Sequence, residues 1–237
     1  MAAPPHVNLW ETKSFADVTV VSCEKYEIPA HKSIICVRNR FFDNCLRTGF
    51  VESVTGRVSL TEEFDIIEGL LQHMYGVEVT LLRPLDAQNT NVESKTWKLN
   101  RLIALYVCAD KYGVADLQEK VAQGFSSRLA SIDDPAIILN IATVVYDQTA
   151  FFDVQLRSGM IKHVQAHLDT ILSTDESAST LLGIAELNLD ILKRAAPVLQ
   201  QQAQAVKSGS APTPKKRKSP RIPQHTPGTY ALRVHMS

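Results

Sequence analysis

The chain has 237 residues, 45% of them hydrophobic, which is enough to bury the core of one domain or of two small ones. It contains no run of about 18 apolar residues, and its first residues, MAAPPHVNLWETK, lack the basic and apolar regions of a secretory signal. We therefore expect neither a membrane span nor a secreted protein. The four cysteines have no CxxC spacing and are predicted to be reduced thiols of an intracellular protein: Cys23, Cys36, Cys45 and Cys108.

Equal numbers of cations and acids, 25 of each, conceal an uneven distribution of charge. Residues 200–237 hold seven cations and no acid, so residues 1–199 carry 18 cations against 25 acids, a net charge of −7. An acidic body with a basic tail is typical of a folded domain whose tail carries a targeting signal or binds nucleic acid.

The first third of the chain predicts a small sheet with short helices. In chain order, the patterns predict strands over 18–21 and 26–28 joined by a turn over 22–25, helices over 31–37 and 41–46, a strand over 58–60, and a helix with apolar residues from Phe64 to Met74. Pro29 marks the end of the second strand. Thr61 is the candidate N-cap of the last helix.

Residues 80–98 are polar, aperiodic and interrupted by Pro84, so they predict a loop longer than the usual connection. The rest of the chain up to residue 202 predicts helices. Their apolar faces cover 99–109, 115–129, 137–146, 152–168 and 182–199. Gly113 suits the left-handed position after the first of these helices, and Asp134-Pro135 suits the start of the third. Pro197 is expected to kink or fray the last helix.

These patterns divide the chain into an N-terminal arm (1–14), a first domain (15–125), a helical extension (126–202) and a basic tail (203–237). The tail is rich in Lys, Ser, Pro, Gly and Thr and is predicted to be disordered, because it offers too little apolar surface to offset the entropy of ordering. The predicted fold class is α+β, mostly α, with a small sheet flanked by helices.

Three segments in this order resemble the BTB/POZ domain: DVTVVSCEKYEIPAHKSIICVRNRFFDNCLRTGFVES (Asp17–Ser53), RVSLTEEFDIIEGLLQHMYG (Arg57–Gly76) and LIALYVCADKYGVADLQEKV (Leu102–Val121). The resemblance covers about half of the chain. It implies a protein–protein interaction domain that dimerises, without MATH, Kelch or zinc-finger modules. Two features depart from the family: the connection that contains Trp97 is longer, and the arm before Asp17 is too short for the strand-exchanged dimer of longer-armed members.

Asp17, His31 and Lys32 combine an acid, an imidazole and an amine, the groups of proton chemistry. No nucleophile motif, phosphate loop or carboxylate pair accompanies them, so we do not expect an enzyme. The resemblance implies that Asp17 and Lys32 form a charged pocket near a dimer interface. The alternative is structural: His31 bonds locally and caps a helix, while Asp17 and Lys32 pair across the strand ends.

Phe50-Val51-Glu52 matches a hydrophobic-x-Glu motif of family members that recruit a cullin ubiquitin-ligase scaffold. The resemblance implies that Phe50 is an apolar anchor and Glu52 the acid that pairs with a cationic patch. The alternative is that Phe50 folds back onto the domain and that Glu52 is a solvated acid.

Lys215, Lys216, Arg217 and Lys218 form a cationic run that fits a nuclear-import sequence. A solvated basic tail is the alternative. Because no aromatic residues interleave with the cations, specific nucleic-acid binding is not expected. His163 and His167 lie one helical turn apart, but no third metal ligand accompanies them, so a surface pair is the favoured interpretation.

The sequence therefore predicts a non-enzymatic interaction protein without cofactor or metal, nuclear or nucleocytoplasmic. Its expected partners are a second copy of itself, possible cullin scaffolds and an unknown client. Two mechanisms remain open: an adaptor that brings a client to a cullin ligase through Phe50 and Glu52, and a nuclear scaffold or transcriptional co-regulator that dimerises through the Asp17 face.

Overall fold

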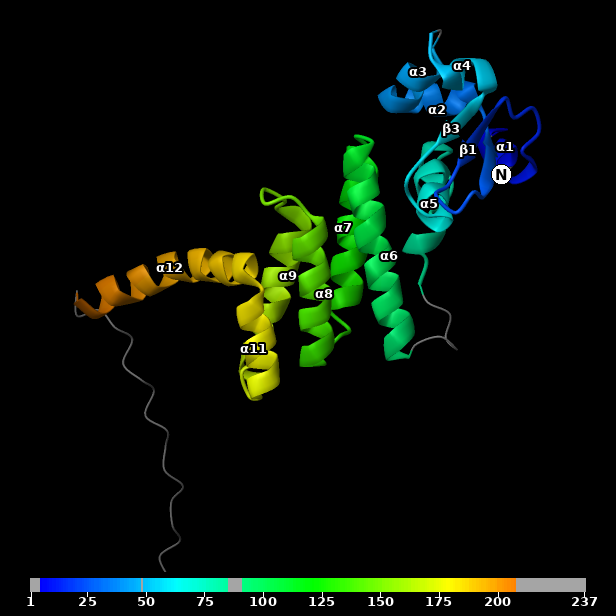
Figure 1. Ribbon diagram of the computed structural model, residues 1–237. Helices are drawn as coiled ribbons and strands as arrows, with labels where there is room; N and C mark the ends of the chain where they lie inside the picture. Colours follow the sequence, from blue (N-terminus) through cyan, green and yellow to red (C-terminus); the bar gives the residue numbers. More distant parts are fainter. Residues whose placement is uncertain (1–4, 48, 85–90, 208–237) are drawn as a thin grey trace, which may run out of the picture. The chain divides into compact units, whose positions relative to one another are not determined.

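A computed structural model describes residues 5–47, 49–84 and 91–207 of the chain. The first part of the fold is a small sheet with short helices around it (Figure 1). Its elements are α1 (Pro5–Thr12), β1 (Val18–Val21), β2 (Glu27–Ala30), α2 (Lys32–Arg38), α3 (Arg40–Leu46), α4 (Val51–Thr55), β3 (Arg57–Ser59) and α5 (Phe64–Met74). This is the mixed, mostly helical class that the sequence predicts.

The three strands are ordered β2-β1-β3, with β1 antiparallel to β2 and parallel to β3. Val20 faces Ile28 in one neighbour and Val58 in the other, and all three side chains are buried. Pro29 lies inside β2 opposite Thr19 and does not end the strand. A proline is tolerated there because β2 is an edge strand, where one side of the backbone needs no partner.

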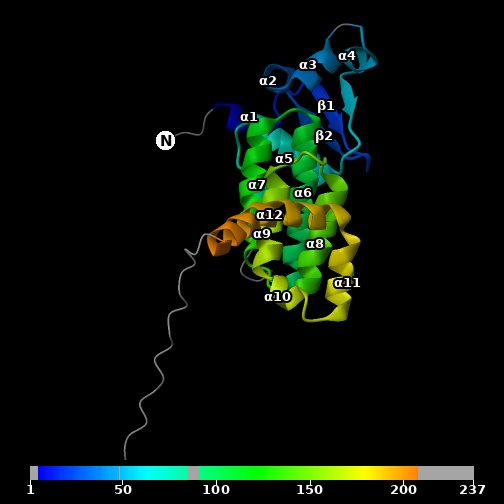
Figure 2. The same cartoon turned by 90° about the vertical axis from the view of Figure 1, so that its left-hand side faces the viewer.

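The second part of the fold is a bundle of helices (Figures 1 and 2). Its elements are the 3-10 turn η1 (Thr80–Leu82), α6 (Val92–Lys111), α7 (Ala115–Leu129), α8 (Pro135–Gln148), α9 (Gln155–Ala166), α10 (Leu168–Ile171), α11 (Asp175–Gly183) and the first part of α12 (Ala185–Lys207). The residues of α12 from Ala196 onward belong to a separate unit. The long helix α6 packs against α5, α7 and α8. Its fully buried residues Leu99, Leu102 and Ile103 join the sheet region and the helical bundle in one core.

Two predicted helix boundaries agree with the structure. Gly113 has the left-handed φ of 68° directly after α6, where glycine has no Cβ to clash. The Asp134 carboxylate accepts the backbone N–H groups of Ala136 and Ile137, and Pro135 is the first residue of α8.

Other predicted boundaries are wrong. The loop over 80–98 is shorter than predicted, because η1 and the first turns of α6 occupy both of its ends and the Asn91 side chain caps α6 at Ser94. Thr61 does not cap α5, whose N-cap residue is Glu63. α12 continues beyond Pro197 to Lys207, so residues assigned to the tail from 203 onward begin as helix. Residues 208–237 lie outside the described part of the chain.

In residues 5–47, 49–84 and 91–207, no helix combines the length and the apolar character needed to cross a lipid bilayer.

Candidate interaction site

The imidazole of His31 is buried, with 5% of the residue exposed, at the junction of β2 and α2. Its Nε2 lies 2.7 Å from the backbone oxygen of Ser14, and because a carbonyl oxygen only accepts, Nε2 carries the proton and donates. Its Nδ1 lies 2.6 Å from the Tyr75 hydroxyl and accepts the hydrogen bond that this hydroxyl donates. The same hydroxyl accepts the backbone N–H of His31 at 2.8 Å. Both ring nitrogens are therefore used within the fold.

Tyr75 is the member of this cluster that sequence reasoning missed. It is fully buried at the end of α5, and burial raises the pKa of its hydroxyl to about 12, so the group stays protonated and able to donate. No local pattern pairs it with His31, which is 44 residues away. A buried tyrosine needs a hydrogen-bond partner for its hydroxyl. The sequence could therefore indicate that Tyr75, once buried, bonds to a polar group, but not which one.

The N-terminal segment packs onto the same tyrosine. The Trp10 ring of α1 lies 5.1 Å from the Tyr75 ring, and the Lys13 ammonium lies 3.1 Å from the centre of the Trp10 ring. Burial lowers the pKa of Lys13 to about 8. Residues predicted as an arm thus form a helix that is held against the domain by ring contacts and by the Ser14–His31 bond.

Asp17 and Lys32 contact each other through the backbone of Lys32. The Asp17 carboxylate accepts the Lys32 N–H at 2.8 Å, at the start of α2, where backbone N–H groups lack helical partners. The expected ion pair between the two side chains is not formed among the described residues, and the His31 side chain makes no capping bond to α2. Asp17 therefore does the capping that we predicted for His31.

Phe50 and Glu52 lie at the start of α4. Phe50 is 57% exposed, and its neighbours on the same short helix, Val51 and Val54, are 73% and 87% exposed. Glu52 is half-buried, and none of the ion pairs in the described part of the chain uses its carboxylate. The alternative in which Phe50 folds back onto the domain does not describe this geometry. We call Phe50, Val51, Glu52 and Val54 the α4 surface.

The α4 surface has a defined backbone. The Phe50 oxygen accepts the Ser53 N–H at 3.1 Å and the Ser53 hydroxyl at 2.6 Å. At the other end, Gly56 has the left-handed φ of 63° and its N–H donates to the Glu52 oxygen at 2.9 Å. A positive φ of this size favours glycine. The exposed side chains are thus presented by a closed helical turn.

A family model for the BTB/POZ domain matches residues 7–128, which is just over half of the chain. The chain belongs to the BTB/POZ domain family. Its BTB domain implies a role in protein–protein interaction, and domains of this family are typically interaction modules. The match begins inside α1, so the N-terminal helix is part of the BTB domain.

One curated protein with a similar region is the human "Inhibitor of Bruton tyrosine kinase". It is 23% identical over 129 residues, which cover 54% of this chain and 9% of that protein. The similarity is therefore confined to a region the size of the BTB domain.

The remaining predicted groups lie outside the residues of the family match or outside the described residues. The Nε2 of His163 contacts the Ile132 oxygen at 2.8 Å, and the Nδ1 of His167 contacts the His163 oxygen at 2.9 Å. Within the described ranges, no group of three or more potential metal ligands is found. The cationic run Lys215, Lys216, Arg217 and Lys218 lies outside the described residues.

Proposed function

We propose that this protein is a non-enzymatic adaptor whose BTB domain self-associates and binds a cullin ubiquitin-ligase scaffold. The observation that carries the proposal is the α4 surface, where an aromatic ring and two valines face solvent beside an unpaired acid. Exposed aromatic residues are the usual anchors of protein interfaces, and a neighbouring acid adds charge selectivity.

Co-precipitation tests the cullin part of the proposal. The wild-type protein should recover the scaffold, and the double variant Phe50→Ala with Glu52→Ala should lose it. A matched control removes a side chain of similar exposure and an exposed acid elsewhere, with Leu172→Ala and Glu176→Ala. Equal recovery by wild type and by the Phe50/Glu52 variant would reject the adaptor role.

Self-association is supported by exposed apolar side chains just before Asp17 in the chain and on α2. Phe15 is 91% exposed with a left-handed φ of 64°, and Val37 of α2 is 84% exposed. A stable interface buries on the order of 1,200–2,000 Å² in total, so a dimer needs a wide face and not these residues alone. Light scattering after size exclusion should give twice the chain mass for wild type and a lower mass for Phe15→Asp with Val37→Asp.

A nuclear scaffold or co-regulator is the second candidate, favoured by the cationic run Lys215–Lys218 in the sequence. Residues 205–225 fused to a cytosolic reporter should move the reporter into the nucleus. A reporter that stays in the cytosol would reject the import signal.

A further inference from the structure

The first part of α12 has apolar residues on two sides, and it packs on the protein with only one of them. Leu187 is fully buried, and Ile191 lies one helical turn further along and packs partly against the core. Leu189 and Leu192 lie on the other side of the helix and are 45% and 65% exposed. The apolar face that the sequence predicts over 182–199 contains these two leucines, so it is not the face that packs.

The residues of the exposed face recur with the spacing of a coiled coil. Steps of four and three residues alternate in the first part of α12 and in the sequence that follows: Ala185, Leu189, Leu192, Ala196 and Leu199. This spacing keeps apolar side chains along one stripe when a second helix lies beside the first. A surface helix needs only one apolar face, so a second face with this spacing indicates a helical partner. We call Ala185, Leu189 and Leu192 the α12 stripe.

Polar contacts hold the first part of α12 in place without using the stripe. The Tyr146 hydroxyl donates to the Asp190 carboxylate at 3.1 Å, and the buried Arg157 guanidinium donates to Glu186 at 2.5 Å. Burial and the neighbouring Asp190 raise the pKa of Tyr146, so its hydroxyl keeps the proton that it donates. The stripe is therefore presented by a helix whose position is fixed.

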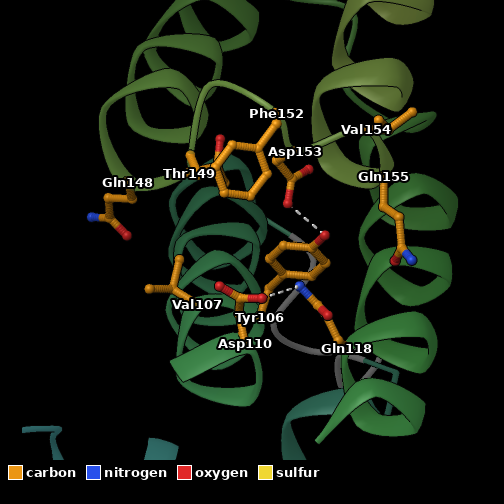
Figure 3. Close-up of a pocket in the computed structure, with 11 residues that line it drawn as sticks. Tyr106, Val107, Asp110, Gln118, Gln148, Thr149, Phe152, Asp153, Val154 and Gln155 are labelled. Carbon is orange, nitrogen blue, oxygen red and sulfur yellow. Dashed lines mark hydrogen bonds between the residues drawn. The ribbon is translucent and has the colours of Figure 1, made fainter. Parts of the chain in front are cut away.

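The loop between α8 and α9 supports the same helix on its flank. The Lys193 ammonium of α12 lies 5.2 Å from the centre of the Phe151 ring in this loop. The loop is itself held by the Tyr106 hydroxyl, which donates to Asp153 at 2.6 Å (Figure 3). These contacts leave the leucines of the stripe exposed.

Two opposite charges, Glu186 and Lys193, lie on one flank of the stripe. The Glu186 side chain is 49% exposed, and Arg157 contacts only one of its two oxygens, Oε2. The Lys193 side chain is 55% exposed and pairs with Asp190 at 3.6 Å. Because exposed ion pairs within a chain contribute little, both groups can also pair with charges on another molecule.

A second copy of α12 matches these charges in an antiparallel arrangement. When Leu189 of each chain lies against Leu192 of the other, the two-fold axis passes between residues 190 and 191, and each Glu186 lies beside the Lys193 of the other chain. A shift by one heptad in either direction instead brings Lys193 against Lys193, or Glu186 against Glu186. Parallel helices in register place Lys193 beside the uncharged Asn188. The stripe is thus self-complementary, as a two-fold interface requires, and like charges disfavour the shifted arrangements.

We propose that the α12 stripe is a second self-association surface, on which the first parts of two α12 helices pack antiparallel around Leu189 and Leu192. Glu186 and Lys193 form two ion pairs between the chains. Two leucines and one alanine from each chain bury less than the roughly 1,200–2,000 Å² of a standard interface, so the association is weak. The stripe shares no residue with the α4 surface or with Phe15 and Val37 of the BTB domain, so it links chains independently of them.

Site-directed disulfides test the pairing on the full chain. Chains with Leu189→Cys are mixed with chains with Leu192→Cys, both in a background with the exposed thiol removed by Cys23→Ser. After oxidation, the disulfide between positions 189 and 192 should exceed those between identical positions by about fivefold or more, because a disulfide needs Cα atoms less than about 7 Å apart. Mass spectrometry of the linked peptides measures the yields.

The matched control replaces Leu172, an exposed leucine outside α12, by Cys. A yield between positions 189 and 192 that is no greater than the yield with Leu172→Cys would overturn the proposal. Predominant disulfides between identical positions would overturn the antiparallel arrangement.

A charge reversal tests the flank of the stripe. Lys193→Glu in both chains sets an acid against each Glu186, and it should lower the yield between positions 189 and 192 by about fivefold, since two ion pairs become repulsive contacts. Lys120→Glu on α7 makes the same change in net charge at an exposed position, and it should change the yield by less than about twofold. Equal losses with both variants would mean that only the net charge matters and would reject the paired arrangement.

The same disulfide separates this inference from self-association of the BTB domain. Adding Phe15→Asp with Val37→Asp should leave the yield between positions 189 and 192 unchanged, and loss of the disulfide in that variant would reject an independent surface. Twice the chain mass in light scattering together with no disulfide between positions 189 and 192 would reject the α12 stripe and leave self-association of the BTB domain standing.

Discussion

Replacing Tyr75 with Phe removes a single oxygen atom, but it should destabilise the BTB domain strongly. The hydroxyl accepts the His31 backbone N–H and contacts the Nδ1 of its ring, and both residues are buried. Phe fills the same space, so no cavity forms and the change isolates the hydrogen bonds. The variant leaves a buried N–H and a buried ring nitrogen without a partner.

The expected cost follows from these two orphaned groups. Each buried polar group without a partner costs about 1–3 kcal/mol, so Tyr75→Phe should lower the free energy of unfolding by about 2–6 kcal/mol. A typical domain has only about 5–15 kcal/mol of stability. The change is therefore a large fraction of the total.

Urea unfolding followed by circular dichroism at 222 nm measures this loss. The midpoint should fall while the slope with urea stays constant, because the unfolded chain exposes the same surface. Tyr26→Phe is the matched control: Tyr26 is 59% exposed, and within the described residues its hydroxyl makes no hydrogen bond. The control should stay within about 0.5 kcal/mol of wild type. A Tyr75→Phe variant as stable as the control would refute the role of the hydroxyl in holding His31.

Burial opposes the charge of Glu62, but bonds from Lys111 and Tyr112 outweigh it and lower the carboxyl pKa below 4.5. The unfolded chain then binds more protons near that pH, so stability falls as the pH drops through this range, and Glu62→Gln should flatten the fall in acid melting curves. A Glu62→Gln variant whose stability falls with decreasing pH as steeply as that of wild type would contradict this. Arg157→Met removes a 3%-exposed guanidinium that donates to the backbone oxygens of Tyr146 and Thr149 and pairs with an exposed glutamate of α12. Because these two oxygens lose their donor, it should cost about 2–4 kcal/mol in urea unfolding. The exposed pair of Arg83 is the comparison, since Arg83→Met should cost less than about 1 kcal/mol, and equal costs would be inconsistent with the buried geometry.

The sequence predicts the local features of this fold well. The β-branched runs around Val20 and Ile28, the cap at Asp134 and the glycine after α6 each depend on neighbouring residues, and the structure has all of them. The order of three motif-bearing segments was enough to indicate the BTB family, which the family match over residues 7–128 confirms.

The features that the sequence does not predict depend on contacts between distant residues. The early start of α6 follows a polar stretch in which the helical signals are weak, namely the cap at Asn91 and the acid Glu93 in the first turn. α1 contains no strong periodic pattern, and its position depends on Trp10 meeting Tyr75 across the fold. The partner of His31 lies in α5, so spacing near His31 could not reveal it.

The candidate interaction residues, too, were predicted only where they depend on a local sequence motif. The motif identified Phe50 and Glu52, but only the structure shows that Val51 and Val54 extend the exposed surface beside them. The hydrogen bond between Tyr106 and Asp153 was not predicted at all, because the two residues are 47 positions apart and come from different elements.

The central claim is that the α4 surface binds a cullin scaffold, and calorimetric titration with a purified scaffold N-terminal domain tests it most directly. Wild type and the Leu172/Glu176 control should bind with one scaffold per BTB domain and equal affinity. Phe50→Ala with Glu52→Ala should bind at least about tenfold more weakly, which is a loss of about 1.4 kcal/mol or more. Binding of equal strength by the Phe50/Glu52 variant, or no binding by wild type, would contradict the account.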